Sequence, residues 1–207
     1  IDGQTLVAAE GSRIERIALQ GIPITRGGTI GFQVENVMAA VAAAWAVNLS
    51  WETIKSGLAS FVTDTHNAPG RFNVMDYAGA TVIADYGHNP DAMLALVAVV
   101  NAMPGQRRSV VISGAGDRRD NDISGQTVIL GAALDDVILY QDAAQRGRAD
   151  GEVMALLREG LKGATRTTQI EEIRGEFLAI DTALARLQPG DLCLILVDQV
   201  QEALDHL

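Results

Sequence analysis

The stretch TVIADYGHNPDAMLALVAVVNAM, residues 81–103, decides the fold of most of this chain. It opens with a short run rich in Val and Ile, which is typical of a buried strand and which ends near Asp85. Pro90 then begins a run with helical spacing, and proline suits the first turn of a helix because its missing N–H would have no partner there. A strand that leads directly into a helix predicts one unit of a parallel sheet covered by helices.

The same alternation continues toward residue 197. Short apolar runs separated by amphipathic runs predict an α/β fold, a Rossmann-like, mostly parallel sheet with flanking helices. The expected strands are 107–116, which ends in glycines, 135–142, a weak strand or loop at 165–173, and 191–197. The expected helices are 123–134, 151–161 and 175–187.

Residues 1–66 have a different character. A hairpin-like stretch comes first, then the glycine-rich loop 21–31 and a helix over 34–47. A second helix is expected from Trp51 to Phe61, with Ser50 as its N-cap. The turn-rich segment THNAPGR at 65–71 breaks the pattern, so we predict two domains, 1–66 and 67–207.

Composition excludes several classes of function. The net charge of the 207 residues is −10 and only two lysines are present, whereas nucleic-acid binding needs clustered cations. No run approaches the roughly 20 apolar residues of a membrane helix, and the first residues do not resemble a signal peptide. The single Cys193 lies in an apolar run and is expected to be a buried thiol. We therefore expect a cytoplasmic protein with no nucleic-acid or membrane partner.

Polar residues follow three of the predicted strands, at the sheet edge where α/β proteins bind ligands. After the first strand, Asp85 could accept the hydroxyls of a ribose, and His88 could meet an anion at a helix N-terminus. The alternative is that Asn89 is only a helix cap before Pro90, with Asp85 and His88 solvated.

The next two strand ends carry glycine and charge. In the segment 114–120 the glycines could admit a ligand to the backbone while Asp and Arg recognise charged groups, or the segment could be a solvated loop with two ion pairs. Asp142, Arg146 and Arg148 repeat this theme, although a surface loop is the favoured interpretation when these residues are taken alone. The spacing of the His and Cys residues predicts no metal site, and the chain has neither a GxxxxGK[ST] phosphate loop nor a GxGxxG fingerprint.

Several segments together resemble one known family. They are PGRFNV (69–74), DYGHNPDAM (85–93), SGAGDRRD (113–120), RGRADGEV (146–153) and PGDLCLILVDQV (189–200). In this order they resemble the Mur ligase and folylpolyglutamate synthetase superfamily, and DRRD, RGR and DQV resemble its cyanophycin synthetase branch. The upstream segment 22–45 resembles the end of the central, ATP-binding domain of these enzymes.

The resemblance implies an ATP-dependent amide ligase. In such enzymes ATP phosphorylates a carboxylate and an amine attacks the acyl phosphate, with Mg²⁺ assisting. In the cyanophycin branch the Mur-like module joins arginine to the side-chain carboxylates of an aspartate polymer, and its members are commonly homo-oligomers. The phosphate loop and most Mg²⁺ ligands of the family lie earlier in the central domain, so this chain is expected to be a fragment that is inactive alone.

The resemblance also assigns residues. For ATP binding it implies Gln33 and Asn36 at the adenine, Arg71 beside the nucleotide and Asp85 at the ribose. Gln33 replaces the family's usual Asn, and Phe32 stands where His is usual. For the substrate side it implies His88, which is also the candidate catalytic residue, together with Asn89, Asp117, Arg118, Asp120, Asp142 and Arg146. We hypothesise that Asp142 pairs with the guanidinium of the incoming arginine.

Two other functions stay open at this stage. The chain could belong to a ligase of the same superfamily that adds a different amino acid. It could also be a non-catalytic nucleotide-binding module that keeps Asn36, Arg71 and Asp85 as a ligand site without chemistry. A dehydrogenase domain is disfavoured because GxGxxG followed by an acid is missing.

Overall fold

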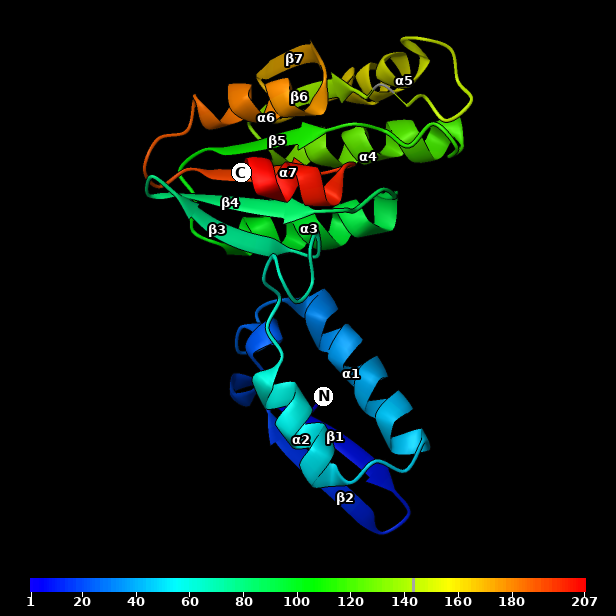
Figure 1. Cartoon of the computed structure of the whole chain (residues 1–207), viewed down its shortest axis with the longest axis vertical. Coiled ribbons are helices and arrows are strands. Elements are labelled where there is room, and N and C mark those ends of the chain that lie inside the picture. Colours follow the sequence, from blue (N-terminus) through cyan, green and yellow to red (C-terminus); the bar gives the residue numbers. More distant parts are fainter. Residues whose placement is uncertain (143) are drawn as a thin grey trace. The chain divides into compact units, whose positions relative to one another are not determined.

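The computed structural model describes residues 1–142 and 144–207, and these divide into two compact units, Ile1–Thr63 and Asp64–Leu207. Figure 1 shows the elements of each unit. Each unit has its own apolar core, so we describe them separately. Among the described residues, no helix is both long and apolar enough to cross a membrane.

The first unit is a hairpin packed against two helices. Ser50 caps the second helix, since its Oγ accepts a hydrogen bond from the backbone N–H of Thr53 at 3.2 Å. The elements are β1 (Thr5–Glu10), β2 (Arg13–Ala18), the short 3₁₀ turns η1 (Leu19–Gly21) and η2 (Pro23–Thr25), α1 (Gly31–Ala46) and α2 (Trp51–Ser60). Their core is formed by Leu6, Leu19, Ile22, Val34, Val37, Val41, Trp51 and Ile54.

The second unit contains a six-stranded sheet of order β3-β4-β8-β5-β6-β7. Only the edge strand β3 runs antiparallel to its neighbour, which confirms the mostly parallel α/β fold expected from the sequence. The last strand of the chain, β8, lies between β4 and β5. The strands are β3 (Asn73–Tyr77), β4 (Ala80–Asp85), β5 (Arg108–Ile112), β6 (Asp136–Gln141), β7 (Gln169–Arg174) and β8 (Leu192–Leu196).

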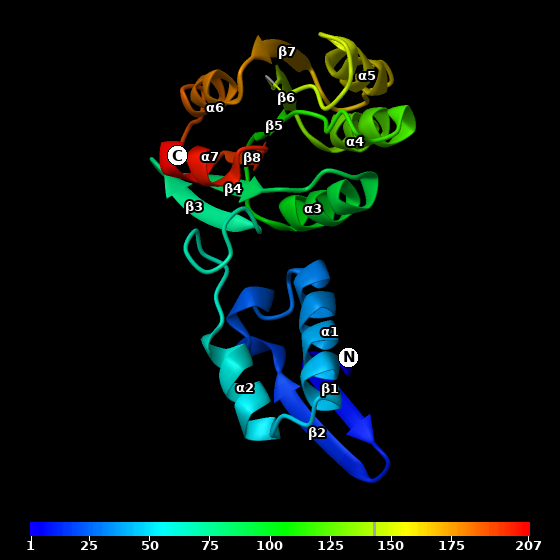
Figure 2. The ribbon, with the colours of Figure 1, turned by 45° about the vertical axis from the view of Figure 1, so that its right-hand side comes forward.

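Helices cover both faces of this sheet, as Figure 2 shows. One layer contains α3 (Pro90–Ala102), α4 (Asp120–Ala133) and α5 (Glu152–Leu161), and the other contains α6 (Glu176–Leu184) and α7 (Val200–His206). Alternate strand residues face opposite layers, so Val82, Val111 and Cys193 pack toward α6 and α7. Cys193 is fully buried and its pKa is raised to about 11 by that burial, as expected for a structural thiol.

Candidate functional site

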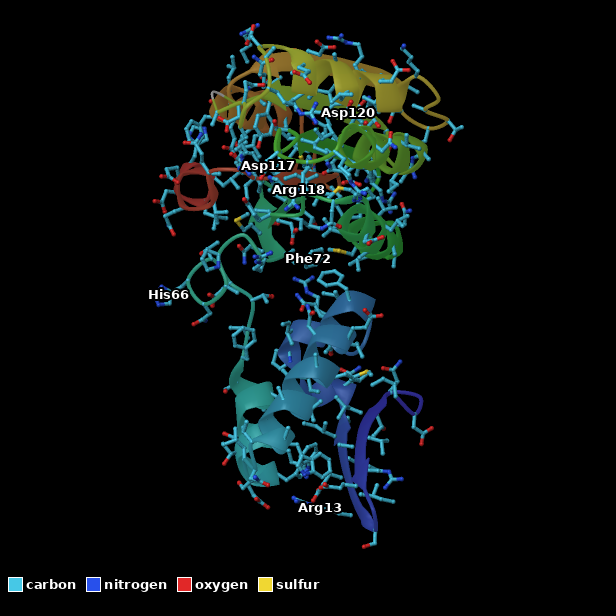
Figure 3. The ribbon with its side chains drawn as sticks, turned by 90° about the vertical axis from the view of Figure 1, so that its right-hand side faces the viewer. Arg13, His66, Phe72, Asp117, Arg118 and Asp120 are labelled. Atoms are coloured by element: carbon cyan, nitrogen blue, oxygen red, sulfur yellow. The ribbon has the colours of Figure 1, made fainter. Side chains whose placement is uncertain are left out.

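The carboxyl ends of the parallel strands β4, β5, β6 and β8 meet at one edge of the sheet. The polar segments predicted from the sequence follow β4, β5 and β6 at this edge. Figure 3 labels Asp117 and Arg118, which lie between the end of β5 and the start of α4, and Asp120, which is the first residue of α4. The edge therefore gathers side chains from distant parts of the sequence.

Asp85 and Arg71 belong to one cluster at the end of β4. The carboxylate of Asp85 accepts a hydrogen bond from the backbone N–H of Phe72 at 2.9 Å, and the N–H of Tyr86 donates to the carbonyl of Gly70 at 2.9 Å. These bonds hold the 70–72 turn against the strand end, and the guanidinium of Arg71 lies 5.8 Å from the centre of the Tyr86 ring. The turn therefore carries the guanidinium of Arg71 close enough for its charge to act on the carboxylate of Asp85.

The environment of Asp85 makes its carboxyl group weakly acidic. Burial raises its pKa to about 6, although the hydrogen bond from Phe72 and the charge of Arg71 oppose the shift. A carboxyl group that titrates near neutrality at a strand end is a candidate for ligand contact.

A second cluster is centred on Asp198, which follows β8. Its Oδ1 lies 3.3 Å from Nε2 of His88 and accepts a hydrogen bond from Nη2 of Arg146 at 2.6 Å. The ring of His88 stacks on that of Tyr86, with centroids 4.4 Å apart. The other terminal nitrogen of Arg146 lies 3.7 Å from the carboxylate of Asp117. The structure thus brings His88, Arg146 and Asp117 together around a residue that was not among the predicted site residues.

Charged neighbours control the ionisation of this cluster. The pKa of Asp198 is lowered to about 2, mainly by the hydrogen bond with His88 and further by a hydrogen bond with Asp142 and the charge of Arg146. Glu176, which is 2% exposed, receives hydrogen bonds from the backbone N–H groups of Asp198 and Gln199 at 2.8 and 3.1 Å. Burial is the main cause that raises the pKa of Glu176.

Arg148 joins the loop after β5 to the loop after β6. It donates to the carbonyl oxygens of Gly116 and Arg118 at 2.8 and 2.6 Å, and pairs with Asp120 at 2.8 Å. A Cβ at Gly116 would stand 2.1 Å from the carbonyl oxygen of Gln145. The lack of a side chain at Gly116 therefore makes room for the backbone of Gln145. The sequence had led us to expect that it makes room for a ligand.

The remaining residues expected at the substrate side have varied surroundings. Asn89 caps α3, since its side-chain oxygen accepts from the N–H of Ala92 at 2.8 Å. This confirms the cap in the capping alternative, but His88 is buried and not solvated as that alternative required. Asp142 is half-buried beside Asp198. Arg118 is exposed, and the side chain of Asp120 is 69% exposed even though it pairs with Arg148.

Gln33 and Asn36 lie in the first unit, on the first two turns of α1. The side-chain amide of Asn36 donates to Oε1 of Gln33 at 3.1 Å, while Gln33 is buried and Asn36 is exposed. Positions three apart share one face of a helix, so this contact follows directly from their spacing. The pair presents amide groups of the kind that recognise a nucleobase edge.

Sequence reasoning missed Asp198, Glu176 and the connecting role of Arg148. A signal for Asp198 was available, because it directly follows the buried run of β8 and the rule about strand ends applies to it equally. Glu176 gave no such signal, since an acid in the first turn of a helix is ordinary.

Within the second unit, the carboxylate of Asp85 and the guanidinium of Arg71 have the chemistry that suits ribose hydroxyls and phosphates. Among the residues that the structure describes, no group of three or more His, Cys, Asp or Glu side chains is arranged to hold a metal ion.

The chain resembles known proteins in sequence. The family model described as "Mur ligase, glutamate ligase domain" matches residues 70–196. Cyanophycin synthetase from Synechocystis sp. is 33% identical over 193 residues, which is 93% of this chain and 22% of that protein. UDP-N-acetylmuramoyl-L-alanyl-D-glutamate–2,6-diaminopimelate ligase from Geobacillus kaustophilus is 30% identical over 79% of this chain and 32% of its own length. The chain thus spans between a fifth and a third of these relatives.

Solved structures show the same fold. Escherichia coli FolC in complex with ADP superposes with a TM-score of 0.67 at 24% identity, over 99% of this chain and 47% of FolC. A MurF from Acinetobacter baumannii gives a TM-score of 0.60 at 19% identity, over 92% of this chain and 38% of MurF. The match over residues 70–196 includes all six strands of the sheet and most of the strand-end residues described above, although Asp198 lies just outside it. The chain belongs to the Mur ligase family.

Proposed function

We propose that this chain supplies the nucleotide-facing and amine-facing surfaces of an ATP-dependent amide ligase of the cyanophycin synthetase type. The observation that carries the proposal is the pairing of two clusters at one sheet edge, Asp85 with Arg71 and His88 with Arg146 around Asp198. The sequence relatives are ligases by name, and cyanophycin synthetases are among them. Because the chain spans 22% of the length of cyanophycin synthetase, we propose that it acts within a longer ligase.

The first cluster is the nucleotide side of this proposal. Asp85 would accept hydrogen bonds from the ribose hydroxyls, and Arg71 would neutralise phosphate charge. In the first unit, taken by itself, Gln33 and Asn36 are the residues that we propose for adenine, through the groups that their mutual hydrogen bond leaves free. ATP, when bound, supplies the phosphoryl group that converts a carboxylate into an acyl phosphate. Mg²⁺ would assist that transfer, with ligands that we place mostly outside the described residues.

The second cluster is the amine side. Arg146 and His88 would face the incoming amino acid, with Asp117, Arg118 and Asp120 at the rim and Asn89 fixing the turn. Asp142 would pair with the guanidinium if the amine substrate is arginine, because carboxylate and guanidinium match in charge and in planar geometry. The acceptor would be a side-chain carboxylate of an aspartate polymer. The assembled ligase would be a homo-oligomer.

Nucleotide binding can be tested on the chain itself. ADP titrated into ¹⁵N-labelled chain should shift the amide resonances of residues 70–72 and 85–88, and Asp85→Ala or Arg71→Ala should abolish these shifts. Asp76→Ala, which changes an acid on the neighbouring strand β3, is the matched control and should keep them. Shifts that are absent from the unaltered chain at millimolar ADP would contradict the nucleotide assignment.

Turnover can be tested in the longer ligase. The chain alone should release no phosphate from ATP, whereas the longer ligase should release ADP only when an amino acid and an aspartate polymer are both present. Comparing single amino acids identifies the amine, and arginine is the expected one. Asp142→Asn should then raise the KM for arginine about tenfold, and an unchanged KM would dismiss Asp142 as its partner.

A further inference from the structure

Asp198 connects two residues that the proposed function places beside the substrate. One carboxylate oxygen, Oδ1, lies 3.3 Å from Nε2 of His88 and 2.6 Å from Nη2 of Arg146. His88 precedes Asp198 by 110 residues and Arg146 precedes it by 52, so the strand order β4-β8-β5-β6 brings them to the same edge of the sheet. A single side chain thus fixes the relative positions of two loops.

Asp198 is itself held firmly. Its side chain is 13% exposed, and its backbone N–H donates to Oε1 of Glu176 at 2.8 Å. The other oxygen of Glu176 accepts from the N–H of Gln199 at 3.1 Å, so both carboxylate oxygens bind the turn after β8. Because its backbone is fixed in this way, the carboxylate of Asp198 is well suited to orienting other groups.

The contact also determines which nitrogen of His88 carries a proton. A carboxylate can only accept a hydrogen bond, so Nε2 must be the donor, and in the neutral ring Nδ1 then carries the lone pair. Nδ1 is buried and has no hydrogen-bond partner, while the His88 ring is held by stacking on Tyr86. A buried nitrogen without a partner marks a place where a further polar group belongs.

We propose that Asp198 is a positioning residue of the amine-binding side, a role that rests on the proposed function. It holds the imidazole of His88 as the Nε2–H tautomer, which leaves Nδ1 as an acceptor for a donor group of the incoming amino acid. It also holds the guanidinium of Arg146 at a fixed place beside that acceptor. Asp198 contacts the amino acid only through these two residues.

The tautomer can be measured on the chain without any turnover. In ¹⁵N-labelled chain at pH 8, the ring nitrogens of His88 should show the Nε2–H pattern, and Asp198→Asn should move them toward a mixture of tautomers. His206, whose Nε2 lies 2.8 Å from Asp181, is an internal control that Asp198→Asn should leave unchanged. A protonated Nδ1 in the unaltered chain, or a His88 spectrum that Asp198→Asn does not change, would overturn the proposal.

Kinetic measurements on the longer ligase can distinguish whether Asp198 positions the amine-binding residues or only stabilises the fold. Asp198→Asn should raise the KM for the amino acid at least about tenfold and leave the KM for ATP within about twofold, while Asp198→Glu should recover part of the loss. Asp181→Asn should change neither constant. If Asp198→Asn lowers only the thermal midpoint and leaves the KM for the amino acid unchanged, Asp198 is a structural anchor and the proposal fails.

The two proposals fail in different ways. A ligase that shows no amino-acid-dependent release of ADP would contradict the proposed function, and the tautomer of His88 would still decide whether Asp198 orients this ring. Should Asp198→Asn fail to fold, Asp198→Glu provides the second variant for both measurements.

Discussion

The backbone N–H of Phe72 donates a hydrogen bond to Oδ2 of Asp85 at 2.9 Å across 13 residues of sequence. This bond anchors the turn that carries Arg71 to the end of β4, so the two proposed nucleotide contacts are fixed by the same interaction. The same arrangement keeps the carboxylate of Asp85 partly away from water, which disfavours its charged form. Burial therefore raises the pKa of Asp85 to about 6.

Replacing Asp85 should change how stability depends on pH. The folded pKa of about 6 exceeds the ordinary value of 3.8, so the folded state binds the proton more tightly and loses stability as the pH rises from about 4 to 6. Asp85→Asn keeps an oxygen for the Phe72 N–H and removes this loss. We expect Asp85→Asn to raise the free energy of unfolding at pH 7 by about 1–2 kcal/mol. At pH 4 the free energy of unfolding should be unchanged.

Urea unfolding at several pH values measures this difference. The curves for the unaltered chain and Asp85→Asn should diverge between pH 4 and pH 6, and parallel curves would show that the carboxyl group is not perturbed. Asp76→Asn, at an exposed position on β3, should follow the unaltered chain.

Asp198 should change the pH dependence of stability in the opposite direction to Asp85. Its folded pKa of about 2 lies below the ordinary 3.8, so its contribution is present above pH 4 and is lost as the pH falls toward 2. We expect Asp198→Asn to lower the free energy of unfolding by about 1–2 kcal/mol at pH 7. The difference from the unaltered chain should shrink below pH 4 in the same urea titrations, and a constant difference down to pH 3 would contradict the assignment.

Arg148 should matter more for stability than its position in a surface loop indicates. Its side chain is 15% exposed and holds the carbonyls of Gly116 and Arg118, which would lose a partner in Arg148→Ala. We expect the thermal midpoint to fall by about 5 °C. Arg174→Ala is the control, because the side chains of Arg174 and its partner Asp150 are 74% and 67% exposed. Loss of so exposed an ion pair should change the thermal midpoint by less than about 1 °C. Equal effects of the two variants would argue against the connecting role of Arg148.

Gly116 should tolerate no side chain. An added Cβ would stand 2.1 Å from the carbonyl oxygen of Gln145, so one of the two loops must move. We expect Gly116→Ala to lower the free energy of unfolding by about 2 kcal/mol or more. Gly163→Ala is the matched control, because nothing lies within 4 Å of its added Cβ. Chemical unfolding of both variants measures the difference, and a stable Gly116→Ala chain would show that the loops separate easily.

The periodicity of the sequence predicted the sheet and most of its helices, because buried parallel strands are continuous apolar runs and their helices are amphipathic. It did not predict β3 or α7. The strand β3 has five residues and is antiparallel at an edge, with a two-residue turn at Ala78 and Gly79, both at positive φ. The helix α7 has seven residues, too few for a periodic signal.

The candidate site was predicted less completely than the fold, for a topological reason. Residues after a strand can be recognised locally, as Asp85 and Asp142 were. Which strand ends are neighbours depends on the order of strands in the sheet, and no local pattern places β8 between β4 and β5. The meeting of Asp198 with His88 and Arg146 was therefore beyond the sequence reasoning, although each residue stood in a quoted motif.

The place of β8 also has a consequence for synthesis of the protein. The pairing of Val82 with Cys193, and of Val110 with Leu194, needs a segment that leaves the ribosome after the other five strands of this sheet. Until then β4 and β5 have no common partner, and each presents open backbone groups and apolar side chains to the cell. The edges of β4 and β5 in the nascent domain thus stay exposed until β8 pairs with both strands. Chaperones that shield unpaired strands would act during this interval.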